Sequence, residues 1–320
     1  MKLAFIIDPI AKLDPAHDTS VALMEAACRR GDEVFIANMN SLSVKDSKAW
    51  AFLQPTKIHP VPLVDGKWQV PQPWYEVSQG EFQPLENMQF VWMRPDPPVT
   101  TEYLYATYIL DYVEASKTRV LNSPLGIRAA NEKMYALQFQ GAIPKTIVTA
   151  DKGTIIDFVA AEGNAVMKPL GGKGGEGILF LETGDRNINS LIEISTNIGK
   201  TPVMVQEYLP AAQDGDKRII LLDGEPIGAV NRVPKLGEFR GNMAAGGRAA
   251  QIDITDRERE ICTQLAPTLK ADGLMFVGID VIGGYLTEVN VTSPTGVREI
   301  DRLDGVSLGD RVMDWLAAQL

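Results

Sequence analysis

The sequence predicts an α/β protein of three units, and three observations support this prediction. Residues 1–123 alternate short apolar runs with helical runs, the pattern of a sheet covered by helices. A glycine-rich segment then lies between two strand-like runs, and further on two apolar strands flank the pair Gly283-Gly284. We therefore expect an N-terminal α/β unit over 1–123, a smaller α+β unit over 124–200 and a third unit over 201–320.

In the first unit, apolar periodicity predicts the elements in chain order. They are a strand at 3–7, a helix at 19–30 closed by Gly31, a strand at 33–37, a strand at 90–93, a helix at 101–116 and a strand at 119–122. Between 54 and 83 the prolines predict hairpin or loop instead of long regular elements. The strand–helix–strand order is typical of a doubly wound, Rossmann-like sheet.

The other two units have shorter predicted elements. We expect a helix that contains Glu132-Lys133, then strands at 145–148, 165–168 and 177–181. Strand-like runs follow at 203–207, 218–222, 275–280 and 285–290. One helix lies between them, because Thr255 and Glu258 have the spacing of a capping box and an apolar stripe continues after them.

Composition and charge narrow the classes of function. The 320 residues are 45% hydrophobic and 22% charged, which is typical of a globular chain. The net charge of -10 argues against a nucleic-acid or anionic-membrane partner, and no apolar run is long enough to cross a bilayer. Cys28 and Cys262 have no metal-ligand or redox spacing around them, so we expect two core thiols in a reducing cytoplasm.

The glycine-rich segment, Lys-Pro-Leu-Gly-Gly-Lys-Gly-Gly-Glu-Gly from Lys168 to Gly177, contains the pattern G-x-G-x-x-G. A dinucleotide-binding loop with that pattern opens a helix, whereas a strand-like run follows here, and a P-loop needs Ser or Thr after its Gly-Lys. Both of these interpretations fail on context. The segment instead predicts a flap whose bare N–H groups, at Gly172, Gly174 and Gly175, approach phosphates. A merely flexible surface loop is the alternative.

Two lysines and one strand end extend the predicted nucleotide site. Lys168 ends an apolar strand beside the flap, where a half-buried ammonium group needs an anionic partner. Taken alone, Lys133 would be interpreted as part of a solvated helix face. Together with Lys168 it is a candidate for a second phosphate contact. The strand that ends at Gln206-Glu207-Tyr208-Leu209 can offer backbone groups to an adenine edge, although an ordinary core strand fits equally well.

A set of oxygen ligands lies on the hairpin around Gly283-Gly284. Period-two alternation places Glu288 and Asn290 on one face, and Asp280 can lie opposite them on the partner strand. Carboxylate and amide oxygens suit magnesium, which often takes few protein ligands and completes its shell with phosphates and water. The alternative is a charged, solvated face of an antiparallel hairpin.

Several arginines are candidates for binding carboxylates. Arg94 follows an apolar strand at the carboxyl edge of the predicted parallel sheet, where open α/β folds bind ligands. Arg218 opens a strand, and a basic loop over 231–242 contains Arg232 and Arg240 in an acidic protein. Because arginine binds carboxylates through two parallel hydrogen bonds, this set suits a peptide substrate.

Taken together, these segments resemble the ATP-grasp ligases, and more closely the bacterial glutathione synthetases. The likeness spans nearly the whole chain. It rests on the strings at 93–98 (Met-Arg-Pro-Asp-Pro-Pro), 105–110, 131–133 (Asn-Glu-Lys), 214–218 (Asp-Gly-Asp-Lys-Arg), 240–242, 245–248 and 287–295 (Thr-Glu-Val-Asn-Val-Thr-Ser-Pro-Thr).

The resemblance implies an ATP-grasp fold behind an N-terminal Rossmann-like, substrate-binding domain, with a central lid domain and a C-terminal domain that holds the metal. It further implies ATP as co-substrate, Mg²⁺ or Mn²⁺ as cofactor, γ-glutamylcysteine and glycine as the joined substrates, and a homo-oligomer. The implied ATP-binding residues are Lys133, Lys168, Gly172, Gly174, Gly175, Gln206, Glu207, Tyr208, Leu209 and Asp216. The implied metal ligands are Asp280, Glu288 and Asn290, the substrate contacts are Arg94, Arg232, Asn242, Ser293 and Thr295, and the catalytic residues are Arg218 and Arg240. Lys173 and Glu176 receive no role.

Two other functions are compatible with parts of this pattern. A D-alanine or glutamate-adding ATP-grasp ligase would keep the ATP and metal residues but not the string from Arg94 to Pro98. A non-catalytic ATP-binding regulator on the same fold would not need the three metal ligands. Both observations favour the glutathione synthetase interpretation.

Overall fold

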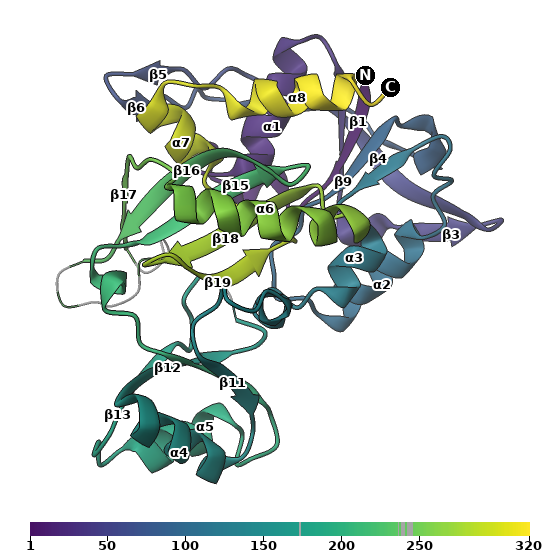
Figure 1. The fold of residues 1–320 in the computed structure, drawn as a ribbon. Coiled ribbons are helices and arrows are strands. Elements are labelled where there is room, and N and C mark those ends of the chain that lie inside the picture. Colours follow the sequence, from purple (N-terminus) through teal and green to yellow (C-terminus); the bar gives the residue numbers. More distant parts are fainter. Residues whose placement is uncertain (173, 236, 238–240, 242–245) are drawn as a thin grey trace.

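Figure 1 shows the computed structural model of the chain, which describes residues 1–172, 174–235, 237, 241 and 246–320. An eight-stranded, a four-stranded and a five-stranded sheet follow one another along this part of the chain, with a small hairpin of two strands beside them. The four-stranded sheet and its helices stand apart at the bottom of the view, and both termini lie close together at the top.

The N-terminal sheet has the strand order β10-β9-β1-β2-β4-β3, with β7 and β8 paired to β4. Its first four strands are parallel, and β4 is antiparallel to β2. The bounds are β1 (Lys2–Ile6), β2 (Glu33–Ala37), β3 (Ser43–Lys45), β4 (Lys48–Ile58), β7 (Tyr75–Val77), β8 (Glu81–Pro84), β9 (Phe90–Met93) and β10 (Arg119–Leu121). The separate hairpin is β5 (Leu63–Val64) and β6 (Lys67–Trp68).

Helices cover both faces of this sheet, as the doubly wound pattern predicts. Along β1, Leu3 and Phe5 pack in the same core as α1 (Thr19–Arg29), whereas Ala4 and Ile6 pack with α2 (Thr101–Leu110). The period-two alternation of a strand buried on both sides accounts for this division.

Two expectations for this unit were wrong in part. The hairpin of β5 and β6 lies within 54–83 as predicted, but strand β4 runs through Pro55 into this range. A proline removes only one donor from an antiparallel ladder, and the neighbouring pairs hold the strand. Helix α2 ends at Leu110 instead of residue 116. The N–H groups of Tyr112 and Val113 donate to carbonyls only three residues back, so the chain leaves the helix in a turn.

The central unit has its own core. Its antiparallel sheet has the order β11-β14-β12-β13, and apolar side chains of α4, such as Ile155 and Val159, pack with Met167 and Val205 from the sheet. The bounds are β11 (Thr146–Thr149), α4 (Lys152–Glu162), β12 (Asn164–Pro169), β13 (Leu179–Glu182), α5 (Ile188–Ser195) and β14 (Val203–Glu207). Strand β14 lies beyond the expected boundary at residue 200, yet it is an inner strand of this sheet.

The C-terminal sheet is antiparallel, in the order β17-β16-β15-β18-β19. Its helix α6 begins with the predicted capping box of Thr255 and Glu258. The bounds are β15 (Asp216–Leu222), β16 (Glu225–Val233), β17 (Arg248–Ala250), α6 (Asp256–Ala271), β18 (Phe276–Ile282), β19 (Tyr285–Asn290), α7 (Val297–Asp304) and α8 (Leu308–Ala317). Among the described residues, no helix combines the length and the apolar character that crossing a membrane requires.

The N- and C-terminal units are joined closely. The Asn122 side chain, just after β10, donates to the carbonyls of Phe276 and Val291, each at 2.8 Å. Helix α8 returns to pack against α1, with Gly309 close to the carbonyl of Ala22 (Figure 1). The carboxyl edge of the parallel sheet is thereby fixed beside the β18–β19 hairpin.

The buried Asp301 of α7 makes stability depend on pH. Burial raises the pKa of Asp301 from its ordinary value to about 7, and its Oδ1 accepts the N–H of Leu308 at 2.8 Å. A raised carboxyl pKa favours folding below the unfolded value and costs stability as pH rises through 7. Asp301→Asn, which keeps the acceptor, is therefore expected to be more stable than the parent by on the order of 2–4 kcal/mol at pH 8.

The difference in unfolding free energy between Asp301→Asn and the parent should shrink toward zero near pH 4. Chemical denaturation between pH 4 and 8 measures it, with the exposed Asp304→Asn on the same helix as control. A stability difference that does not change with pH would contradict the prediction.

Candidate active site

A cavity of about 660 Å³ lies where the three sheets approach one another. Segments of all three units line it: residues 12–18 and 96–97, the flap and the end of β14, and the β18–β19 hairpin with the following 292–296 loop. Its size is that of a small-molecule site.

The hairpin has the predicted geometry. Asp280 on β18 is directly opposite Glu288 on β19, and Gly278 is opposite Asn290. The turn between the strands needs glycine, because Gly283 and Gly284 have φ angles of +56° and +80°. Asp280, Glu288 and Asn290 all line the cavity, so alternation and register bring the predicted oxygen ligands together.

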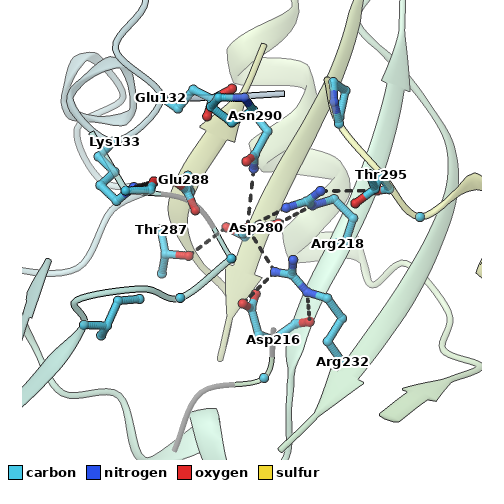
Figure 2. A pocket seen from close by; sticks show the side chains of 18 of the residues that line it. Glu132, Lys133, Asp216, Arg218, Arg232, Asp280, Thr287, Glu288, Asn290 and Thr295 are labelled. Atoms are coloured by element: carbon cyan, nitrogen blue, oxygen red, sulfur yellow. Dashed lines mark hydrogen bonds and ion pairs between the residues drawn. The ribbon is translucent and has the colours of Figure 1, made fainter. Parts of the chain in front are cut away.

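Asp280 is enclosed by two arginines (Figure 2). Arg218 donates to its two oxygens from Nε and Nη2 at 2.5 and 3.0 Å, and Arg232 Nη2 lies 2.9 Å from Oδ2. Burial alone would raise the pKa of Asp280, but the two guanidinium groups outweigh it and hold the pKa below its usual range. Asp280 is therefore an ionised carboxylate on a hairpin that faces the cavity.

Asp216 shares Arg232 with Asp280 but is less well compensated. Its Oδ2 lies 2.6 Å from Arg232 Nη2, and burial raises its pKa. Its buried Oδ1 has no hydrogen-bond partner among the described residues. An unsatisfied buried oxygen beside a cavity is favourably placed to accept a bond from a ligand.

Lys133 links the flap to the hairpin, although it is not in the helix that the sequence predicts. It lies in a turn between α3 (Pro124–Ala129) and a 3₁₀ helix over Met134–Gln138, because Asn131 Oδ1 accepts the N–H groups of Lys133 and Met134. Its Nζ donates to the Gly172 carbonyl at 2.9 Å and to Glu288 Oε1 at 3.0 Å.

The second predicted lysine and the strand end form the opposite wall. Lys168 Nζ donates to Gln206 Oε1 at 2.6 Å, and burial lowers the lysine pKa. Residues 206–209 all line the cavity, where Tyr208 lies edge-on to Phe180 with ring centres 5.0 Å apart. This wall combines the ammonium group of Lys168, the polar residues Gln206 and Glu207, and the aromatic ring of Tyr208.

The flap is a loop between two paired strands, as predicted. Strands β12 and β13 are antiparallel, and the loop between them brings Gly172, Gly174, Gly175 and Glu176 to the cavity. Gly174 and Gly175 have φ angles of +61° and +84°, which residues with side chains rarely adopt.

Arg94 is placed differently from the other predicted residues. It is 4% exposed and is not among the cavity-lining residues; it donates to Ser20 Oγ at 2.9 Å and to the Pro294 carbonyl at 3.0 Å. Arg232, Ser293 and Thr295 do line the cavity. Arg240 and Asn242, like Lys173, lie outside the described residues.

The sequence interpretation missed residues that border the cavity. Glu132 is half-buried beside Lys133, and both desolvation and the neighbouring Glu288 raise its pKa. Lys12, His17 and Asp18 form the N-terminal end of the cavity. They follow the first parallel strand, so the rule that singled out Arg94 at the carboxyl edge also applies to them.

Known protein families match both the N-terminal part and the remaining part of this chain. Residues 1–128 match the family model of the prokaryotic glutathione synthetase N-terminal domain, and residues 132–305 match the prokaryotic glutathione synthetase ATP-grasp domain. The chain is 67% identical to the glutathione synthetase of Thermosynechococcus vestitus over 316 residues, which cover 99% of each chain. It is 63% identical to that of Synechocystis sp. over 319 residues, which cover 100% of each.

Solved structures confirm the predicted fold class. The D-cycloserine synthetase DcsG is similar with a TM-score of 0.66 at 16% identity, over 100% of this chain and 99% of that chain. The ATP-grasp ligase PsnB, complexed with minimal precursor, Mg and ADP, has a TM-score of 0.63 at 18% identity, over 99% of this chain and 97% of that chain. At these identities the likeness concerns the fold alone. The two domain models and the full-length relatives show that the chain belongs to the prokaryotic glutathione synthetase family of ATP-grasp ligases.

Proposed function

We propose that this chain joins γ-glutamylcysteine to glycine by transferring the γ-phosphoryl group of ATP to the cysteine carboxylate, which gives an acyl phosphate and ADP, and that the glycine amine then displaces phosphate to form glutathione. The observation that carries the proposal is a single cavity in which a glycine flap, two lysines and the Asp280, Glu288 and Asn290 set adjoin a polar pocket from the N-terminal unit. Family membership supports the same reaction.

ATP is proposed to lie between the central and C-terminal sheets. The backbone of 206–209 and the ring of Tyr208 would hold the adenine, and Asp216 would accept a bond from the nucleotide. Lys133, Lys168 and the N–H groups of the flap would then meet the phosphates. Lys133 already bonds to oxygen acceptors on the flap and the hairpin, and Lys168 to Gln206 on the neighbouring strand, so the phosphates would take over these positions.

The oxygen donors of the hairpin fit a magnesium ion. Asp280, Glu288 and Asn290 offer hard ligands, and the register of the strands brings them to one place. The described residues contain no group of three His, Cys, Asp or Glu side chains suited to a metal, so phosphate or water oxygens would complete the shell. The bound ion, Mg²⁺ or Mn²⁺, would neutralise charge on the phosphoryl group.

The N-terminal end of the cavity is proposed to receive the dipeptide. With ATP against the central sheet, Lys12, His17 and Asp18 remain for a substrate that has both an ammonium group and carboxylates. His17 Nδ1 lies 2.6 Å from Glu299 Oε1, so this end also has paired polar groups. The cysteine carboxylate of the dipeptide would then point toward the phosphoryl-transfer centre.

The protein's role in the chemistry is positioning and charge stabilisation. A free carboxylate is too poor an electrophile for an amine, so its phosphorylation precedes the attack of glycine. Lys133 and Lys168 would offset charge on the transferring group, and Arg218 would stabilise the acyl phosphate and the tetrahedral intermediate. Arg240 is proposed to share this role, and the flap would exclude water from the intermediate.

The reaction is tested by phosphate release from ATP in the presence of each candidate acid and amine. We expect release to depend on both γ-glutamylcysteine and glycine and to yield glutathione, identified by mass spectrometry. Turnover that ignores the dipeptide, or that accepts D-alanine or glutamate in place of glycine without loss, would refute the proposed substrates. Homo-oligomer formation and a cytoplasmic location stay predictions from the resemblance and the composition.

A further inference from the structure

The loop that follows β19 is held residue by residue from distant parts of the chain. Its residues 292–295 line the cavity between the hairpin and the N-terminal unit. The contacts are Thr292 with Glu132, the Ser293 hydroxyl with Asp96 Oδ1 at 2.8 Å, the Pro294 carbonyl with Arg94 Nη2 at 3.0 Å, and the Thr295 carbonyl with Arg218 Nη1 at 3.2 Å. Four charged side chains therefore determine the path of four consecutive residues.

Glu132 makes the densest of these contacts. One carboxylate oxygen, Oε1, accepts the N–H of Val291 at 2.9 Å, the N–H of Thr292 at 3.1 Å and the hydroxyl of Thr292 at 2.9 Å. The Glu132 carbonyl also accepts the N–H of Val289 at 2.9 Å. Backbone and side chain of one residue thus bind the segment that begins directly after the predicted metal ligand Glu288.

Arg94 holds the other side of the loop from beneath. Its Nε donates to Ser20 Oγ at 2.9 Å while Nη2 binds the Pro294 carbonyl, and its guanidinium lies 5.5 Å from the ring centre of Phe276. The side chain is buried and does not line the cavity. Arg94 can therefore influence a ligand in the cavity only by holding Pro294 in place.

We infer that Glu132 and Arg94 are positioning residues for the acid substrate, which they act on through the 292–295 loop and not through ATP. The inference rests on the proposed function for the identity of that substrate. The loop borders the N-terminal end of the cavity, whereas the proposed nucleotide contacts other than Lys133 and Asp216 lie on the central sheet and the flap. A displacement of the loop by a fraction of an ångström would misplace the acid relative to the phosphoryl group.

The test separates the KM for the acid from the KM for ATP. In Arg94→Lys and Glu132→Ala, the KM for γ-glutamylcysteine is expected to rise by about tenfold or more, because charge-assisted bonds to the loop are lost. The KM for ATP should stay within about twofold. Glu132→Gln keeps an oxygen acceptor and should restore most of the affinity for the acid, even if the alanine variant folds poorly.

Matched controls separate positioning from general destabilisation. Glu258→Gln alters another carboxylate that accepts a backbone N–H, and Arg128→Lys alters another arginine that lies over an aromatic ring. Neither residue lines the cavity. Both controls should leave the two KM values unchanged even if the melting temperature falls.

A double-mutant cycle tests the route through the loop. Thr292→Val removes the hydroxyl that donates to Glu132, so its effect on the KM for the acid should largely vanish in the Glu132→Ala background. A crystal structure of Glu132→Ala should show 292–295 displaced. Additive effects, equal rises in both KM values, or an unmoved loop with impaired acid binding would overturn the inference. Wild-type protein that makes no glutathione would instead refute the proposed function, and the displacement of the loop would still be readable.

Discussion

Glu288→Gln is expected to abolish ligation, with a fall in kcat of about 10³-fold or more. The substitution keeps an amide oxygen that can still accept the Lys133 bond, which is 3.0 Å long here, but it removes the negative charge that the proposed magnesium ion requires. The side chain is partly exposed to the cavity and is not part of the core, so the fold should survive. Glutathione formation and circular dichroism measure the two properties separately.

A second measurement links this loss to the metal. In the parent protein, the affinity for an ATP analogue should rise with the Mg²⁺ concentration, and in Glu288→Gln that dependence should be weak or absent. Asn290→Ala should behave in the same way. Glu86→Gln, which alters a carboxylate paired with Lys48 and Lys117 away from the cavity, is the control. Near-normal turnover in either cavity variant would refute the metal assignment.

Arg218→Lys is expected to lower kcat by about 10²-fold while ATP binding changes little. The guanidinium binds both oxygens of Asp280 and also the Thr295 carbonyl, so one group fixes the carboxylate and the substrate loop together. A lysine keeps the charge but has no planar fork, and it cannot make these three bonds at once.

The readout is single-turnover formation of product compared with equilibrium binding of an ATP analogue. Arg257→Lys, an exposed position on α6, is the control for an arginine-to-lysine change in the same sheet unit. If Arg218→Lys kept the parental rate, only the positive charge at position 218 would matter. The proposal that Arg218 stabilises the tetrahedral intermediate would then be wrong.

Local patterns were sufficient for the parts of the site that lie close together in sequence. Alternation around Gly283-Gly284 places Glu288 and Asn290 on one face, and the register then sets Asp280 opposite Glu288. The flap could also be predicted, since its glycines lie between two strand-like runs that do pair. In both cases the arrangement depends on backbone geometry over fewer than twenty residues, and the residue types in the segment determine that geometry.

Local patterns were not sufficient where distant segments meet. The proline-rich stretch after Gln54 suggested hairpin or loop, but pairing of β4 with β2 and β8 extends a strand through Pro55. The 131–133 string suggested a helix, whereas the Asn131 side chain holds a turn there. Long-range pairing and side-chain capping outweigh the local preference in these two places.

The sequence by itself determined the kinds of chemical group in the site: a glycine flap for phosphates, lysines beside it, and carboxylate and amide oxygens on a hairpin. Only the tertiary structure decided how they are combined. It buries Arg94 beneath Pro294, brings Glu132 to Thr292 across 160 residues and adds Lys12 and His17 to the cavity. The physical reason is that these contacts depend on how the N-terminal sheet docks against the C-terminal sheet, and docking is set by the summed burial of two cores instead of by any local motif.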